Sequence, residues 1–173
     1  MFDAVIICLT LALLMFSMCA CASSSVDKST SFANAATSSA SDSDELERYM
    51  NIPEVSAFFE YLDWYMDGIQ SEKINLSDSE QMSNIANTFK ALAESLPAYD
   101  GPSEKVKTVS NYCQVIAYGV GIETNYLAIS ALDQKKGDTR DALDCLEKAN
   151  EYAQETMSTL QKLNDLMNEI RGK

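Results

Sequence analysis

The residues best suited to chemistry lie in the apolar segment 106–132. Polar side chains recur there every seven residues, at Asn111, Tyr118 and Asn125. Residues seven apart share one face of a helix. Glu123 interrupts another, otherwise apolar row, and Gly119 and Gly121 would let neighbouring helices approach closely. The pattern predicts a small polar ligand pocket with Glu123 as its ionisable group. The alternative is that these polar groups reach the rim of a helical bundle and the glycines only ease packing.

The chain contains no histidine. This absence excludes Ser-His-Asp and Cys-His catalysis, His-ligated haem, most zinc sites and the Glu-x-x-His di-iron sites of helix bundles. Carboxylate and tyrosine chemistry around Glu123 is the enzymatic option that remains, and no motif supplies a nucleophile–base pair for it. We therefore expect a protein that is not an enzyme, with no catalytic residues, no metal ligands and no cofactors.

Aromatic residues form a second candidate site within residues 58–65. Tyr61 and Trp64 fall off the main apolar stripe of this segment, so they are predicted to form an exposed docking patch. The alternative is that both pack at the edge of a wide core stripe. Acidic rows at 60–67 and 141–155 lack the spacing of a calcium-binding EF-hand and are predicted to be solvated helix faces.

Helical periodicity predicts the two elements of the first half of the domain. Apolar residues repeat at threes and fours over 44–69, where Pro53 kinks or restarts the helix. A second helix over 77–96 opens with a capping box, in which Ser77 and Glu80 satisfy exposed backbone donors.

Two longer helices are predicted to follow. Pro102 opens the first of them, which ends at Gly137, and Asp138 caps the second. Small and apolar residues repeat in steps of four and three over 142–170, which favours close antiparallel packing across the tight turn. The predicted fold of residues 44–173 is all-α: an antiparallel up-down four-helix bundle with a long C-terminal helical hairpin.

Of the five cysteines, two lie in the predicted domain. With a hairpin turn near Gly137, Cys113 and Cys145 would lie roughly 20 Å or more apart, since a helix rises 1.5 Å per residue. A disulfide between them is therefore not expected. Both are predicted to be buried small apolar residues.

Part of the same hairpin carries a repeat-like pattern of aromatic, turn and small residues. Its positions are Tyr126, Ile129, Gly137, Asp138, Ala142, Leu146 and Ala149. The pattern resembles a single tetratricopeptide repeat of about 34 residues. The resemblance implies a peptide-binding scaffold, whereas the alternative is a generic helical hairpin.

The N-terminal 25 residues indicate export. An apolar run from Ala4 to Met18 is followed by Ala20, Cys21 and a serine-rich stretch. This resembles a bacterial lipoprotein signal sequence, which implies that residues 1–20 are removed and that Cys21 carries the lipid. Cleavage at an A-x-A site around Cys21 would instead release a soluble protein, and an uncleaved run would act as an anchor.

Residues 21–43 are rich in Ser, Ala and Thr, and they are predicted to be a disordered tether. The formal net charge of −13 repels phosphate backbones, so nucleic-acid binding is not expected. We expect an extracytoplasmic, lipid-anchored helical module of the bacterial cell envelope that binds a protein, a peptide or a small molecule. A structural subunit or homodimer packed through the third helix is the main alternative.

Overall fold

The structure is a computed structural model that describes residues 41–172. Five α-helices and no strand occur in this range, so the expected all-α class is confirmed. The helices are α2 (Asp42–Met50), α3 (Pro53–Gln70), α4 (Ser79–Ser95), α5 (Glu104–Lys136) and α6 (Thr139–Ile170). The predicted signal peptide, the lipidation site at Cys21 and the tether as far as residue 40 lie outside the described residues.

The first predicted helix is two helices. Pro53 is the first residue of α3, where its missing backbone donor costs nothing and its fixed φ suits the helix. The preceding α2 begins at Asp42, two residues earlier than expected. Ser41 caps it, because the Ser41 hydroxyl accepts the Asp44 backbone N–H and the Asp44 carboxylate accepts the Ser41 N–H.

The predicted starts of the next two helices need correction. Asp78 caps α4, not Ser77, and its carboxylate accepts the backbone N–H groups of Glu80 and Gln81 at 3.0 and 3.2 Å. One carboxylate oxygen thus replaces the predicted Ser77–Glu80 capping box. Ser103 caps α5 by accepting the Val106 N–H, so Pro102 lies just outside that helix.

The hairpin between α5 and α6 forms as predicted: Gly137 ends α5, and Asp138 caps α6. Gly137 has φ 82°, a left-handed conformation that glycine adopts without steric cost. Asp138 then caps α6 through the Asp141 backbone N–H. The chain therefore reverses within two residues.

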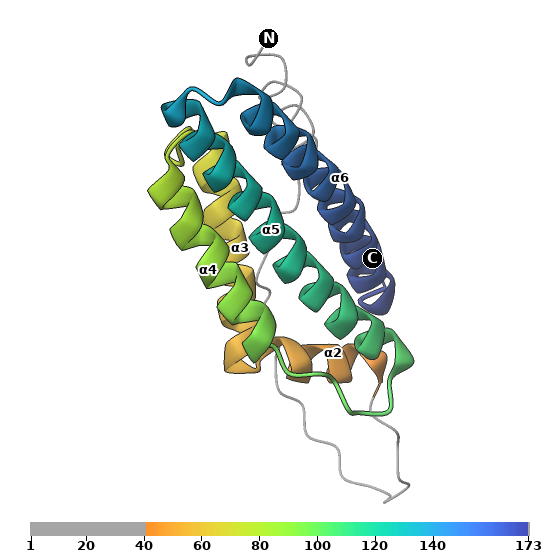
Figure 1. Ribbon diagram of the computed structural model, residues 1–173. Helices are drawn as coiled ribbons and strands as arrows, with labels where there is room; N and C mark the ends of the chain where they lie inside the picture. Colours follow the sequence, from red (N-terminus) through yellow and green to blue (C-terminus); the bar gives the residue numbers. More distant parts are fainter. Residues whose placement is uncertain (1–40, 173) are drawn as a thin grey trace, which may run out of the picture.

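Successive helices from α3 to α6 reverse direction, and α5 lies between α4 and α6 (Figure 1). The glycines of α5 allow this close approach. A Cβ atom at Gly119 would overlap the Thr156 hydroxyl of α6, and the Gly121 position faces the α4 backbone near Ala86 and Lys90. The helix α3 lies behind α4 and α5, and α2 crosses one end beside the start of α5 (Figure 1).

The short helix α2 is attached to that end by polar contacts. The Tyr99 hydroxyl donates to Glu45 at 2.6 Å, and the Ser103 hydroxyl donates to Asp42 at 2.7 Å. Both bonds end on carboxylates, which accept the stronger class of hydrogen bond. They fix α2 against the loop that leads into α5.

Candidate functional site

Glu123 is the most unusual ionisable residue of the described chain. It lies in the interior, 5 % exposed, although a carboxylate is almost never buried without a partner. Its partner is Tyr65 of α3, whose hydroxyl donates to Glu123 Oε1 at 3.3 Å. This distance is long for an O–H···O bond, so the pair is a modest one. The ring of Tyr65 is in turn held edge-on by Phe89 of α4.

Burial controls the protonation of this pair. It raises the pKa of Glu123 from 4.5 to about 8, and the hydrogen bond from Tyr65 lowers it only in part. Burial also raises the pKa of Tyr65 well above its ordinary value, and the neighbouring Glu123 adds to that shift. At neutral pH both groups are therefore uncharged.

An uncharged pair in the core can hold a proton, but it does not meet the needs of a reaction site. A general acid or base has to reach the proton it transfers on a substrate, and Glu123 and Tyr65 are each at most 5 % exposed. No cluster of three or more metal-ligating side chains occurs among residues 41–172. The arrangement favours a structural role for Glu123.

The other three residues of the predicted pocket lie elsewhere on α5. Asn111, Tyr118 and Asn125 are exposed, whereas Glu123 is buried on a different side of the helix. The structure therefore does not bring Glu123 together with them. Helix geometry explains the separation. Residues three or four apart share a face, so 118, 122 and 125 lie on one face, and 123 is turned away from it.

Four large apolar residues share the exposed face with these polar residues. Together they form what we call the α5 seam: Asn111, Val115, Tyr118, Ile122, Asn125, Ile129 and Leu132. All seven are exposed, including Val115 at 53 %, Tyr118 at 47 % and Leu132 at 43 %. Their spacing is 4-3-4-3-4-3, the repeat by which one helix packs against another. No helix of the described chain covers this face.

The seam also explains the composition of α5. By length and hydropathy, α5 is the helix among the described residues that could cross a membrane, but half of its most apolar window is buried. The core helix of a soluble protein meets the same criteria. In α5 the apolar residues serve two faces, the core on one side and the seam on the other.

The neighbouring helices border the seam closely. On the α6 side, Tyr126 stacks on Tyr152 with ring centroids 5.9 Å apart, and the Lys148 ammonium lies 5.4 Å from the Tyr126 ring. On the α4 side, the Gly121 position lies against the backbone of Lys90. The apolar strip is thus flanked by aromatic and charged side chains, as in many protein interfaces.

The predicted docking patch on α3 is divided between core and surface. Tyr61 and Trp64 stack with ring centroids 4.9 Å apart. Tyr61 is half-buried against Phe89, at 5.1 Å between centroids, so it belongs partly to the core. Trp64 is 48 % exposed, and it alone of the two offers a large surface to a partner.

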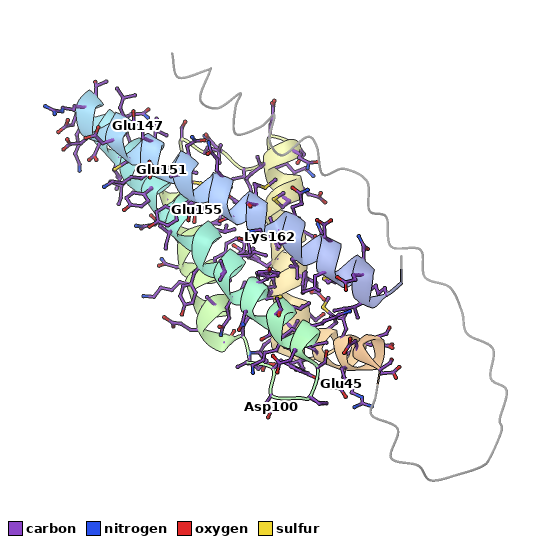
Figure 2. The ribbon with its side chains drawn as sticks, turned by 90° about the vertical axis from the view of Figure 1, so that its right-hand side faces the viewer. Glu45, Asp100, Glu147, Glu151, Glu155 and Lys162 are labelled. Atoms are coloured by element: carbon purple, nitrogen blue, oxygen red, sulfur yellow. The ribbon has the colours of Figure 1, made fainter. Side chains whose placement is uncertain are left out.

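Acidic residues line the outer side of α6. Glu147, Glu151 and Glu155 follow one another at intervals of four and lie along the same helix in Figure 2. All three are exposed. The residues of the predicted acidic row on this helix, Asp141, Asp144, Glu151 and Glu155, are all exposed, as expected for a solvated face.

Neither cysteine of the domain forms a disulfide, as expected. Cys113 is buried, and burial raises the pKa of its thiol to about 12, so it is an unreactive core residue. The expectation of full burial is wrong for Cys145, which is half-buried on α6. Burial, followed by the nearby Asp133 carboxylate, raises the pKa of this thiol as well.

Comparison with known proteins gives no family and no function for the chain. The predicted tetratricopeptide-like pattern and lipoprotein signal remain predictions from their residues. No protein-family model, no curated protein and no solved structure matches the chain.

Proposed function

We propose that this chain is an exported, non-enzymatic interaction module that binds a protein surface through the α5 seam. One observation carries the proposal: five large hydrophobic residues on one face of the longest helix, Val115, Tyr118, Ile122, Ile129 and Leu132, are exposed to solvent and are interrupted within the strip by Asn125 alone. Contiguous exposed apolar surface of this kind marks interaction sites on soluble proteins. The scaffold behind the seam is an antiparallel up-down four-helix bundle of α3, α4, α5 and α6, with α2 across one end.

The shape of the seam favours a protein over a small molecule. Small ligands bind in concave pockets that enclose most of their surface. The seam instead runs along one face of a helix for roughly 32 Å, at 1.5 Å per residue over residues 111–132. A straight strip with heptad spacing fits another helix laid along it.

The location follows from the N-terminal sequence. We propose that Cys21 is lipidated and that residues 21–40 hold the domain near the bacterial envelope. Intact-mass measurement of the membrane fraction tests this, with Cys21→Ala as the matched variant. Added acyl mass on a chain that starts at Cys21, absent from the variant, supports lipidation. Unmodified protein in the medium would instead establish the released soluble form.

The seam is tested in membranes from cells that express the full-length chain. An amine-reactive cross-linker is expected to join the wild type to its partner through lysines near the seam, such as Lys148. The variant Ile122→Asp/Ile129→Asp places two charges in the interface, and burying an unpaired charge costs several kcal/mol. We expect this variant to lose the cross-linked product.

A matched control carries two aspartates away from the seam, Ala57→Asp on α3 and Asn84→Asp on α4, both at exposed positions. Far-UV circular dichroism verifies that both double variants keep their helix content. The control is expected to retain the product. If the seam variant retains it too, the α5 seam is not the binding surface.

A further inference from the structure

The residues at the heptad positions of the seam favour one kind of partner helix over others. With Val115 assigned to position a, all three a positions hold β-branched residues, at 115, 122 and 129. The d positions hold Asn111, Tyr118, Asn125 and Leu132. β-Branched residues at a, combined with Leu at d, are typical of two-stranded parallel pairs, and this seam has the β-branched a positions and Leu at one d position, Leu132. The asparagines lie at d, where a partner amide at the same level would satisfy them.

A parallel pairing of two identical seams matches every layer. Each residue then meets its own twin, so Asn111 faces Asn111 and Asn125 faces Asn125, and each amide has both a donor and an acceptor to offer the other. The apolar layers at 115, 122, 129 and 132 likewise meet apolar layers. No polar group in this arrangement is buried against an apolar one.

An antiparallel pairing does not match in this way. Two antiparallel registers pair six of the seven seam positions, and the more favourable of them places Val115 opposite Leu132. It also places Asn125 opposite Ile122 twice, once on each side. An amide buried without a hydrogen-bond partner costs about 1–3 kcal/mol.

The helices that flank the seam give an independent preference. In a parallel pair the two-fold axis runs along α5, so α4 of each copy lies opposite α6 of the other. In an antiparallel pair α6 lies opposite α6. The α6 sequence holds seven acidic and three basic residues, a net charge of 3 − 7 = −4. The α4 sequence holds two acidic residues and one basic, a net charge of 1 − 2 = −1. The parallel pair avoids placing the two acidic α6 helices against each other.

The parallel arrangement also places two opposite charges at the same height along α5, Lys90 of one copy and Glu155 of the other. Lys90 of α4 lies beside Gly121, and Thr156 of α6, next to Glu155, lies beside Gly119. The two sites are two residues apart along α5, about 3 Å. In a parallel pair Lys90 of each copy is therefore level with Glu155 of the other.

From these observations we infer that the α5 seam pairs with the same seam of a second copy of this chain, in parallel, to form a homodimer. The inference rests on the proposed interaction role of the seam and names its partner. Both copies then present α2, and with it Ser41, where the described chain begins, at the same end. Two lipid anchors at one end can insert in one membrane.

The size of the strip predicts a weak dimer. Stable interfaces bury about 800 Å² per partner, and a strip roughly 32 Å long and 10–12 Å wide offers about half of that. The edges of α4 and α6 must supply the remainder. Tethering to one membrane raises the effective concentration of the second copy and so favours pairing.

The test uses single cysteines at the two ends of the seam, Asn111→Cys and Leu132→Cys, in the full-length chain in membranes. The background carries Cys145→Ser, and the buried Cys113 is left in place. In a parallel dimer each new cysteine lies beside its twin and forms a disulfide under mild oxidation. In the antiparallel register above, twin residues at position 111 are roughly 37 Å apart and cannot.

We expect both variants to form disulfide-linked dimers. A disulfide needs Cβ atoms within about 4.5 Å, so the control Ala57→Cys on α3, which lies away from the seam, should link much less. The linked fraction of the seam variants is expected to exceed that of the control by at least about fivefold. Linkage only between co-expressed Val115→Cys and Leu132→Cys chains, whose new cysteines face each other in the antiparallel register, would overturn the parallel arrangement. Absence of all linkage would overturn the second copy as the partner. The cross-linking test of Ile122→Asp/Ile129→Asp then separates the two proposals: if its product is still lost, the seam binds a different protein, and if it persists, the proposed function fails as well.

Salt gives a second readout of the partner. Each copy carries a formal net charge of −13, so two copies repel each other at low ionic strength. Added salt is expected to increase the disulfide-linked fraction. A decrease with salt would show that attraction between opposite charges dominates the pairing, and it would contradict a dimer held together by the apolar layers of the seam.

Discussion

The buried carboxyl of Glu123 makes the stability of this protein depend on pH in a way that one substitution can isolate. The substitution is Glu123→Gln, which keeps the size of the side chain and an oxygen that can accept the Tyr65 hydroxyl. It removes only the ability to ionise. Other ionisable groups contribute equally to both proteins, so the difference between them reports on Glu123.

The sign follows from proton binding. The folded chain holds the Glu123 proton up to a pKa of about 8, while the unfolded chain releases it near the ordinary value of 4.5. Between these values the folded state binds more protons than the unfolded state, so the stability of the wild type falls as pH rises. The contribution of Glu123 is full below about pH 4.5 and is lost by the time the pH has passed about 8.

The magnitude follows from the size of the shift. Each pKa unit corresponds to about 1.4 kcal/mol, so the wild type should lose about 3 kcal/mol relative to Glu123→Gln between pH 5 and pH 8. For a domain of this length that difference corresponds to about 10 °C in the melting temperature. Glu123→Gln is therefore expected to be clearly the more stable protein at pH 8 and about equal to the wild type at pH 5.

Urea unfolding followed by far-UV circular dichroism measures this difference at both pH values and at constant ionic strength. Glu94→Gln, an exposed position on α4, is the matched control and should follow the wild type at both. Parallel stability curves for the wild type and Glu123→Gln would show that Glu123 ionises normally, and the account of its burial given above would be wrong.

Three further substitutions probe the packing of the helices. Gly121→Ala should stabilise the protein by about 1 kcal/mol in thermal unfolding, because its Cβ would have ordinary contacts with α4 and alanine favours the helix. Gly119→Ala should destabilise it by about 1–3 kcal/mol through overlap with Thr156, and the same change should become neutral or stabilising in a Thr156→Ala background; equal effects in both backgrounds would exclude the overlap. Tyr99→Phe should cost about 1–3 kcal/mol by removing the hydrogen bond to Glu45, and faster amide exchange confined to α2 would locate the loss there.

Local sequence signals were sufficient for most of the helix boundaries. Gly137 and Asp138 end one helix and cap the next because each acts through its own backbone conformation or side chain. Pro53 begins a helix for the same local reason. The start of α4 was misplaced because Ser77 and Asp78 are both good caps, and only the path of the incoming loop decides between them. That path depends on tertiary contacts that a sequence pattern does not contain.

The phase of α5 could not be predicted in the same way. In α6, polar residues surround one apolar seam, so the core-facing side is visible in the sequence. In α5 apolar residues occur nearly all round, and no single phase stands out. Asn111, Tyr118 and Asn125 were correctly placed on one face, but their 4-3 spacing with Val115 and Ile122 was the signal that would have shown an exposed seam. Glu123 was grouped with them only by its nearness in sequence.

The seam and the N-terminal tether strengthen each other as parts of one proposal. A strip of about three heptads, with two of its seven positions occupied by asparagine, is too short and too polar to hold two dilute chains together strongly. The same moderation would keep the exposed face compatible with solubility while the chain is exported as proposed. If Cys21 confines the domain to a membrane, the second copy is always nearby, and a weak interface becomes sufficient. A seam that pairs only after anchoring would therefore couple assembly of the protein to its arrival at the envelope.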